Sequence, residues 1–268
     1  MPLTNYPITA IDQLGFSFTL NQPPKSIVSL VPSITITLFD LGVAKSIIGR
    51  TKFCIHPKST VKSISIIGGT KNLDIEKILS LQPDLILANK EENEKAQIEA
   101  LKQHCNVYVS DVKDLYTNNE MIEQIGWLTN TYDRANQIIN QINEVFKSIT
   151  PFSKQKVAYF IWRQPYMVAG NNTFINHLLK RLNLVNVFEN FEGRYPIINI
   201  DQLKQVSPDF IFLSSEPYPF KSKHIEELKS IVPNAKIVLV DGELFSWFGS
   251  KMIKTPSYIK TLYTMLTS

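Results

Sequence analysis

The sequence predicts an α/β protein of two lobes with mainly parallel sheets, joined by one long helix, with a ligand cleft between the lobes. Three observations lead to this prediction. Apolar strand-like segments alternate with helical segments, a unit of the first half recurs in the second half, and an uninterrupted helical pattern separates the halves. Alternating strands and helices build parallel sheets covered by helices. The predicted boundaries are residues 1–117 for the first lobe, 118–150 for the linking helix and 151–268 for the second lobe.

The first strand and the first helix meet at Pro32-Ser33. Residues 25–31 (KSIVSLV) are mainly apolar and β-branched, which is typical of a buried strand. Apolar side chains then recur at helical spacing from Ile34 to Leu41, and Gly42 suits the left-handed residue that ends a helix. We expect Ser33 to cap this helix by accepting a hydrogen bond from a backbone N–H one turn inside.

The same order of elements continues along the chain. In the first lobe we expect an extended segment, a short helix, a strand, an amphipathic helix and a strand at residues 63–69, 73–81, 83–88, 92–104 and 107–109. In the second lobe we expect a strand, two helices, a strand, a helix and a strand at residues 156–162, 173–182, 200–206, 208–213, 223–231 and 236–240.

The stretch between the lobes has apolar residues at every third or fourth position from Ile122 to Ile149, with no proline between them. This spacing predicts one continuous helix over residues 118–149, about 45 Å long. Such a helix would act as a rigid connection between two bodies.

The second half of the chain repeats part of the first. Residues 73–87 (LDIEKILSLQPDLIL) align without a gap with residues 198–212 (INIDQLKQVSPDFIF), and Glu76 matches Asp201. Helix-turn-strand units are common in α/β proteins, so some of this match is generic. We interpret it as an internal duplication, which predicts two similar lobes and a ligand site in the cleft between them.

The composition is that of a compact globular protein. The chain has 268 residues, 44% of them hydrophobic. Its 28 basic and 24 acidic residues are mixed and give a net charge of +4, so no nucleic-acid partner is expected. Cys54 and Cys105 have neither disulfide nor metal-ligand spacing, and we expect free thiols.

Several segments resemble one known family. They are the strand, Pro-Ser, helix and Leu-Gly order over residues 28–42, the segment IGGTKNLDIEKILSLQPDLILA and the late aromatic turn DGELFSWFGSKMIKTPSYI. This order is similar to that of the binding proteins for vitamin B12 and ferric siderophores, the helical-backbone metal receptors of ABC importers, which have the type III periplasmic-binding-protein fold. The resemblance runs from about Pro24 onward. It implies two Rossmann-like lobes, a chelate held between them, no catalysis and no cofactor beyond the ligand.

The resemblance also implies the ligand class and the partner. The ligand would be a cobalt or iron chelate, with cobalamin or another corrinoid as the first expectation and a ferric siderophore or haem as the alternative. The partner would be the permease dimer of an ABC importer, and the binding protein itself is expected to be a monomer. From another functional class, a cytosolic α/β enzyme acting on a flat aromatic or nucleotide-like substrate in the same cleft remains an alternative.

Candidate ligand-binding residues lie near the ends of predicted strands. Aromatic rings offer area and stacking to a flat chelate, and an arginine suits the carboxylates or catecholates of an anionic siderophore. Each aromatic side chain could equally belong to a core. The resemblance places Tyr195 where B12-binding relatives carry a pocket aromatic. The candidates are Pro32, Ser33, Phe53, His56, Trp162, Arg163, Tyr166, Arg194, Tyr195, Phe245, Trp247 and Phe248.

No metal site of the protein's own and no catalytic residue is predicted. The sequence has no nucleophile elbow or phosphate loop, and three of its four histidines lie on helices expected in the outer layer. His56 remains a candidate axial ligand for a cobalt or iron ion. Glu76 and Asp201 each open a short helix, where an acidic side chain favours the helix dipole. The resemblance implies that this pair docks onto arginines of a two-fold symmetric transporter.

The family resemblance implies a periplasmic or cell-surface protein. The N-terminus MPLTNYPITAIDQLGFSFTL, however, lacks the basic start and apolar run of a secretory signal. A chain used as written is therefore expected in the cytoplasm, and one made with a leader outside it.

Overall fold

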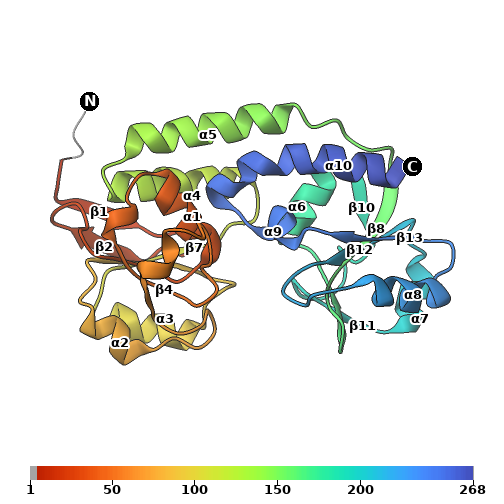
Figure 1. The fold of residues 1–268 in the computed structure, drawn as a ribbon, viewed down its shortest axis with the longest axis horizontal. Coiled ribbons are helices and arrows are strands. Elements are labelled where there is room, and N and C mark those ends of the chain that lie inside the picture. The colour runs from red at the N-terminus through yellow and green to blue at the C-terminus, as the bar shows by residue number, and fades with distance from the viewer. Residues whose placement is uncertain (1–4, 268) are drawn as a thin grey trace. The chain divides into compact units, whose positions relative to one another are not determined.

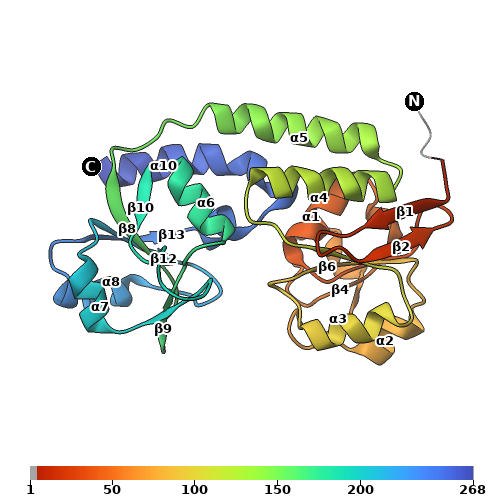
Figure 2. The same cartoon turned by 180° about the vertical axis from the view of Figure 1, so that it is seen from behind.

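The computed structural model describes residues 5–267 and divides the chain into two compact units (Figure 1). Unit 1 extends to Asn143 and includes the returning segment Phe248–Lys251. Unit 2 comprises Glu144–Trp247 and the chain from Met252 onward. Figures 1 and 2 show both units from opposite sides.

Unit 1 is built on a parallel sheet of five strands in the order β5-β4-β3-β6-β7. An antiparallel hairpin, β1-β2, precedes it. Helices α2 and α3 cover one face of the sheet, and α1 and α4 lie on the other (Figures 1 and 2). The strands are β1 (Ile8–Ile11), β2 (Ser17–Leu20), β3 (Ile27–Ser29), β4 (Ile47–Arg50), β5 (Ser65–Ile66), β6 (Leu85–Asn89) and β7 (Val107–Ser110). The helices are α1 (Pro32–Asp40), α2 (Ile75–Ser80), α3 (Lys95–Lys102), α4 (Leu115–Leu128) and α5 (Tyr132–Lys147), the last of which enters unit 2.

Unit 2 has a mixed sheet in the order β11-β9-β8-β12-β13. Strands β12, β13 and β10 run parallel to β8, whereas β9 is antiparallel to both β8 and β11. The strands are β8 (Gln155–Trp162), β9 (Tyr166–Val168), β10 (Leu184–Asn186), β11 (Ile197–Ile198), β12 (Phe210–Ser214) and β13 (Lys236–Val240). The helices are α6 (Phe174–Arg181), α7 (Ile200–Val206), α8 (Ser222–Ile231), α9 (Gly242–Ser246) and α10 (Thr255–Thr267).

The helix-turn-strand match between the two halves is confirmed in detail. Asp74 before α2 and Asn199 before α7 both accept a hydrogen bond from the third backbone N–H of their helix. Gln82 and Ser207, which follow these helices, both have a positive φ, 49° and 44°. The strands that come next, β6 and β12, each pair with the central strand of their sheet. The two units therefore share a local fold as well as a sequence pattern.

The first helix begins two residues earlier than predicted. Its N-cap residue is Val31, no side chain caps it, and Pro32 occupies the first turn. Proline suits this position because its φ is already helical and its missing N–H would have no partner there. Ser33 is therefore inside the helix and only 3% exposed, so the prediction that it is the capping residue was wrong. Gly42, with φ 86°, ends the helix region as predicted.

The predicted continuous helix over residues 118–149 is instead two helices, α4 and α5. The chain turns at Thr129–Thr131, where Asn130 adopts a left-handed φ of 55° that asparagine tolerates better than most residues. The Asn119 side chain, near the start of α4, donates a 3.0 Å hydrogen bond to Asn143 near the end of α5. The two helices are thus antiparallel, and the prediction of one rod was wrong.

The apolar spacing continues across this break because both helices bury an apolar face. Ile122 and Ile125 of α4 and Ala135 and Ile142 of α5 are fully buried. Periodicity alone cannot show that the direction of the chain has reversed. The chain then passes from unit 1 to unit 2 within α5. Within residues 5–267, no helix is both long enough and apolar enough to cross a bilayer.

Candidate functional site

In unit 1, the carboxyl ends of β3 and β4 bring four predicted site residues to one edge of the sheet. Ser29 and Arg50, the last residues of these strands, are register partners. Pro32 follows the first and Phe53 and His56 follow the second, so they leave the sheet at the same edge. Ligands of open α/β sheets bind beyond the carboxyl ends of the strands. We call Pro32, Ser33, Phe53 and His56 the unit 1 edge.

Hydrogen bonds from a buried arginine side chain position the loop after β4. The buried Arg50 side chain donates hydrogen bonds from Nε to the Val61 carbonyl (2.8 Å) and from Nη1 to the Thr51 carbonyl (3.2 Å). The buried Cys54 thiol lies 3.1 Å from Thr51 Oγ1. Burial raises the pKa of Cys54, so the thiol is a packed, protonated group. The Phe53 ring, in contrast, is 50% exposed on this tethered loop.

Two predicted residues of unit 1 are covered. The segment Phe248–Lys251 returns to α1, where the Ser250 backbone N–H donates to Thr37 Oγ1 at 3.1 Å. Phe248 is 7% exposed and Ser33 is 3% exposed. Both side chains therefore pack in the protein interior, and the prediction that they present surface to a ligand is corrected.

In unit 2, aromatic side chains gather at the carboxyl ends of β8, β12 and β13. The Trp162 ring, at the end of β8, is 39% exposed and packs edge-to-face on Tyr218, with 5.6 Å between ring centroids. Its Nε1 donates to the Gln164 carbonyl (3.2 Å). Trp247 Nε1 donates to the carboxylate of Glu216 at 2.6 Å. We call Trp162, Tyr218 and Trp247 the unit 2 edge.

Arg163 and Tyr166, both predicted ligand residues, share a partner on α8. Arg163 Nε and Nη2 donate to Glu227 Oε2 at 3.0 and 2.8 Å, and the Tyr166 hydroxyl donates to Oε1 at 2.5 Å. Burial would raise the pKa of Glu227, but the hydrogen bonds from Tyr166 and Arg163 lower it overall. Burial and the bond to this carboxylate raise the pKa of Tyr166 to about 12. The Arg163 charge is therefore compensated.

Two polar residues of this region were not among the site residues predicted from the sequence. His224, predicted in an outer layer, is 2% exposed; its Nδ1 accepts from the Lys221 backbone N–H at 2.8 Å and its Nε2 lies 3.3 Å from the Tyr218 hydroxyl. Glu227 follows it on the same helix. The only sequence signal was their spacing of three on an amphipathic helix.

Phe245 is a core residue of unit 2. It is completely buried, and its ring centroid lies 5.1, 5.9 and 6.1 Å from those of Tyr159, Phe212 and Tyr258. The aromatic residues of the late turn thus differ in burial: Phe245 is a core residue, whereas Trp247 is partly exposed. The prediction of Phe245 as a ligand contact is corrected.

Arg194 and Tyr195 lie apart from Trp162 along β9. The Gly170 N–H, beyond the carboxyl end of β9, donates to the Arg194 carbonyl at 2.8 Å, whereas Tyr166 begins that strand. Arg194 lines a cavity of about 390 Å³ together with Asn171, Asn172 and Phe191. The half-buried Tyr195 follows it in the chain. Unit 2 therefore offers two surfaces, one at each end of β9.

The comparison with known proteins assigns the family. Residues 27–231 match the family described as "Periplasmic binding protein". This chain belongs to the periplasmic binding protein family. The family and the two-lobed α/β fold predicted from the sequence are both confirmed.

Relatives of this periplasmic binding protein include transporter components. An uncharacterized ABC transporter substrate-binding lipoprotein of Bacillus subtilis, YvrC, is 27% identical over 267 residues, which cover 93% of this chain and 83% of the relative. A vitamin B12-binding protein of Vibrio vulnificus is 24% identical over 207 residues, covering 75% of this chain and 76% of the relative. A solved structure from an Fe3+-hydroxamate transport system of Saccharomonospora viridis has a TM-score of 0.77 at 18% identity and covers 97% and 99% of the two chains.

The acidic pair of this family member occupies matching sites. Glu76 and Asp201 are both exposed and lie in the first turn of α2 and α7. A carboxylate in the first turn interacts favourably with the helix dipole. The position is thus compatible with a helix-stabilising role and with contact to a basic partner.

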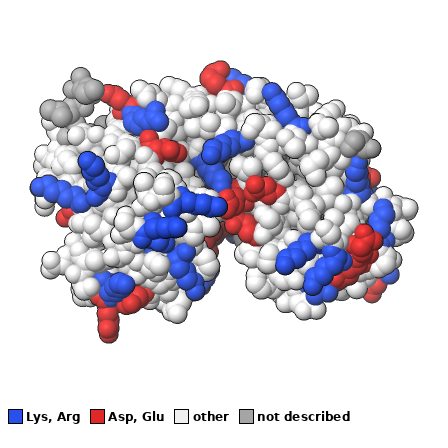
Figure 3. Space-filling model, in the orientation of Figure 1, with Lys and Arg blue, Asp and Glu red and all other residues white. Residues whose placement is uncertain are grey.

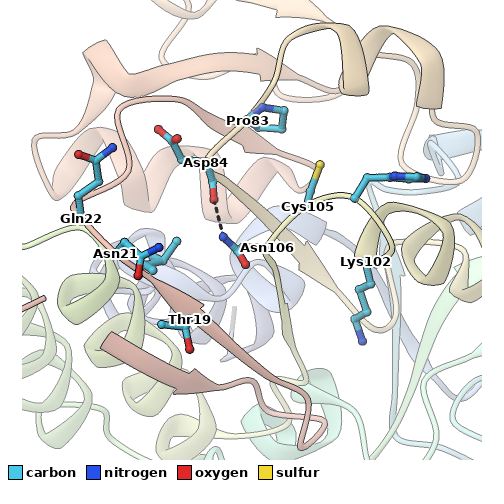
Figure 4. A pocket seen from close by; sticks show the side chains of 10 residues that line it. Thr19, Asn21, Gln22, Pro83, Asp84, Lys102, Cys105 and Asn106 are labelled. Atoms are coloured by element: carbon cyan, nitrogen blue, oxygen red, sulfur yellow. Dashed lines mark hydrogen bonds between the residues drawn. The ribbon is translucent and has the colours of Figure 1, made fainter. Parts of the chain in front are cut away.

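A larger cavity of unit 1 lies away from the unit 1 edge. It measures about 440 Å³ and is lined by residues that precede β6 and β7, among them Asp84 and Asn106 (Figure 4). The predicted ligand residues are not among those that line it. In the part of the chain that the structure describes, no group of three or more His, Cys, Asp or Glu residues could hold a metal ion. Acidic and basic side chains are interspersed on the face shown in Figure 3.

Proposed function

We propose that this protein is the substrate-binding component of an ABC importer and that its ligand is a metal chelate, with cobalamin or another corrinoid first. The observation that carries the proposal is the pair of exposed rings at strand ends, Phe53 at 50% and Trp162 at 39% exposure. The hydrogen bond from Arg50 to Val61 positions the loop that carries Phe53, and the edge-to-face contact with Tyr218 positions Trp162. A flat, partly apolar chelate would cover such rings and gain area and stacking.

The relatives support this choice. Vitamin B12-binding proteins recur among them, and a relative aligned over 93% of this chain is a substrate-binding lipoprotein. Because a chelate brings its own metal, the protein needs no metal site of its own. His56 shares the loop of Phe53 and is the candidate axial ligand.

We also propose that Glu76 and Asp201 bind arginines of the importer permease. Both carboxylates are exposed and stand at duplicated positions, as a partner with two-fold symmetry requires. Charged contacts of this kind set orientation and association rate more than affinity. In this role the protein acts outside the cytoplasmic membrane.

The test is gel filtration of the purified protein with cyanocobalamin, a ferric trihydroxamate or haem. A corrin absorbance that co-elutes with the protein at a stoichiometric ratio supports the proposal. Retention of haem or of the ferric chelate, without retention of the corrin, would show that the protein binds a different chelate. Chemical conversion of a ligand without retention would point to an enzyme.

Variants then locate the binding surface. Phe53→Ala and Trp162→Ala should each weaken chelate binding on the order of tenfold, as expected for central aromatic contacts. Trp127→Ala is the matched control, because Trp127 is also exposed (45%) but lies at the end of α4 and belongs to neither edge. An equal loss in the control would contradict the assignment.

A further inference from the structure

Arg163 adjoins the unit 2 edge, and its charge is compensated by one residue, Glu227. Both Arg163 donors that face α8 end on a single oxygen of Glu227, and Tyr166 occupies the other oxygen. The pair is not in the core, since the side chains of Arg163 and Glu227 are 27% and 32% exposed. Arg163 directly follows Trp162, the exposed ring of this edge.

We propose that Glu227 is a specificity-determining residue, which neutralises Arg163 and thereby makes the unit 2 edge select an uncharged chelate over an anionic one. The inference rests on the proposed function, because it names the charge class of that chelate. An uncompensated arginine at this position would present a planar pair of donors to a carboxylate or catecholate. With Glu227 in place those donors are occupied, and an approaching anion also meets the glutamate.

Stability alone is a weak reason for this arrangement. Ion pairs that remain in contact with water contribute little to folding. Removing an uncompensated positive charge from a ligand surface has a larger effect on which ligands bind, since specificity depends on repulsion as well as attraction. The Tyr166 hydroxyl donates to the other oxygen of this carboxylate, so its bond is separate from those of Arg163.

The decisive variant is Glu227→Gln, which keeps an oxygen for Tyr166 and nearly the same shape but removes the charge. Wild type, Glu227→Gln, Tyr166→Phe and the double variant Arg163→Gln/Glu227→Gln are titrated with three probes. These are a hexadentate ferric tris-catecholate, which is anionic, a neutral ferric trihydroxamate, and cyanocobalamin. Tyr166→Phe is the matched control, because it removes a bond to Glu227 without releasing Arg163.

Glu227→Gln should bind the tris-catecholate on the order of tenfold more tightly than wild type. Affinity for the neutral trihydroxamate should stay within about twofold, the gain should be absent from Tyr166→Phe, and the double variant should lose it. A gain that is equal for both ferric probes, or that persists without Arg163, overturns the inference. So does the absence of any gain.

Two further measurements keep the outcomes separate. Retention of cyanocobalamin by the wild type reports on the proposed function alone, so retention without a gain in Glu227→Gln overturns only the inference. Where Glu227→Gln fails to fold, Arg163→Gln supplies the test, because it leaves the Glu227 charge uncompensated. It should bind the tris-catecholate more weakly relative to the trihydroxamate, and an unchanged ratio overturns the inference.

Discussion

Asp84 and Asp209 make the same connection in the two units. Asp84 Oδ2 accepts hydrogen bonds from the backbone N–H groups of Lys25 and Ser26 at 2.8 and 2.9 Å, and Asp209 Oδ2 accepts one from Lys156 at 2.7 Å. The aspartate N–H in turn donates to the Ser26 or Lys156 carbonyl at 2.9 Å. In each unit this exchange fixes the start of two neighbouring strands, β3 with β6 and β8 with β12.

Asp84→Asn should therefore destabilise the protein at neutral pH by about 1 kcal/mol, because the charge that strengthens two hydrogen bonds is lost. Burial acts to raise the pKa of Asp84, but the hydrogen bonds from Lys25 and Ser26 lower it more, so the pKa is lowered overall. A lowered folded pKa gives stability that is complete above the ordinary value of about 3.9 and is lost as the pH falls through the folded pKa. Urea unfolding at neutral and acidic pH should show the wild-type advantage shrinking in acid.

Local periodicity explains why most elements were predictable. Strands β3, β6, β7, β8, β12 and β13 and most helices follow apolar patterns that the chain carries within one segment, whereas the short strands β4, β9, β10 and β11 were not predicted. The turn between α4 and α5 was not predictable in this way, because it depends on Asn130 and on how closely the two helices pack. The packing is tight at Gly126, where an added Cβ would lie 2.4 Å from the Ala135 Cβ.

Gly126→Ala should destabilise the helix pair despite the better helix propensity of alanine. Overpacking of this kind costs about 1 to 3 kcal/mol. Reciprocal exchange, Gly126→Ala with Ala135→Gly, returns the lost space and should recover part of that stability. Chemical denaturation of the wild type and the two variants checks this. A single variant as stable as the wild type would show that the helices separate freely.

The candidate site was predictable only in part. Trp162 lies beyond a strand end that the sequence marks, so its placement followed from the strand prediction, whereas β4, the strand before Phe53, was not predicted. The partnership of Arg163 with Glu227 joins residues 64 positions apart, and such a contact arises only when β8 and α8 pack. The burial of Phe245 depends likewise on Tyr159 and Phe212, which come from other strands. Contacts between segments that are distant in the sequence could therefore not be predicted from local patterns.

His224 should make the protein sensitive to mild acid. Burial, with help from the charges of Lys223 and Arg163, lowers the pKa of His224, although Glu227 and the Lys221 N–H oppose this. A lowered folded pKa means that stability is complete above the ordinary value of about 6.5 and falls as the pH drops through the folded pKa. A proton on Nδ1 would also displace the Lys221 N–H from its acceptor.

The matched variant is His224→Gln, because glutamine at this helix position can still accept from the Lys221 N–H but does not titrate. Between about pH 7.5 and pH 5, the urea midpoint of the wild type should fall more than that of His224→Gln. His224→Ala should be less stable by about 1 kcal/mol at neutral pH, since the Lys221 N–H loses its partner. Parallel pH profiles for wild type and His224→Gln would contradict the assignment.

Trp247 should contribute to chelate binding through its orientation as well as its area. Its indole N–H donates to Glu216 at 2.6 Å, and the Ser246 hydroxyl donates to the same carboxylate oxygen at 3.2 Å. Trp247→Phe keeps an aromatic ring but loses this anchor, so chelate affinity should fall by about three- to tenfold. Glu216→Gln keeps an acceptor for the indole and should lose less. Isothermal titration with the chelate identified by co-elution distinguishes the two, and equal losses would mean that the carboxylate charge, not the anchored ring, contributes to binding.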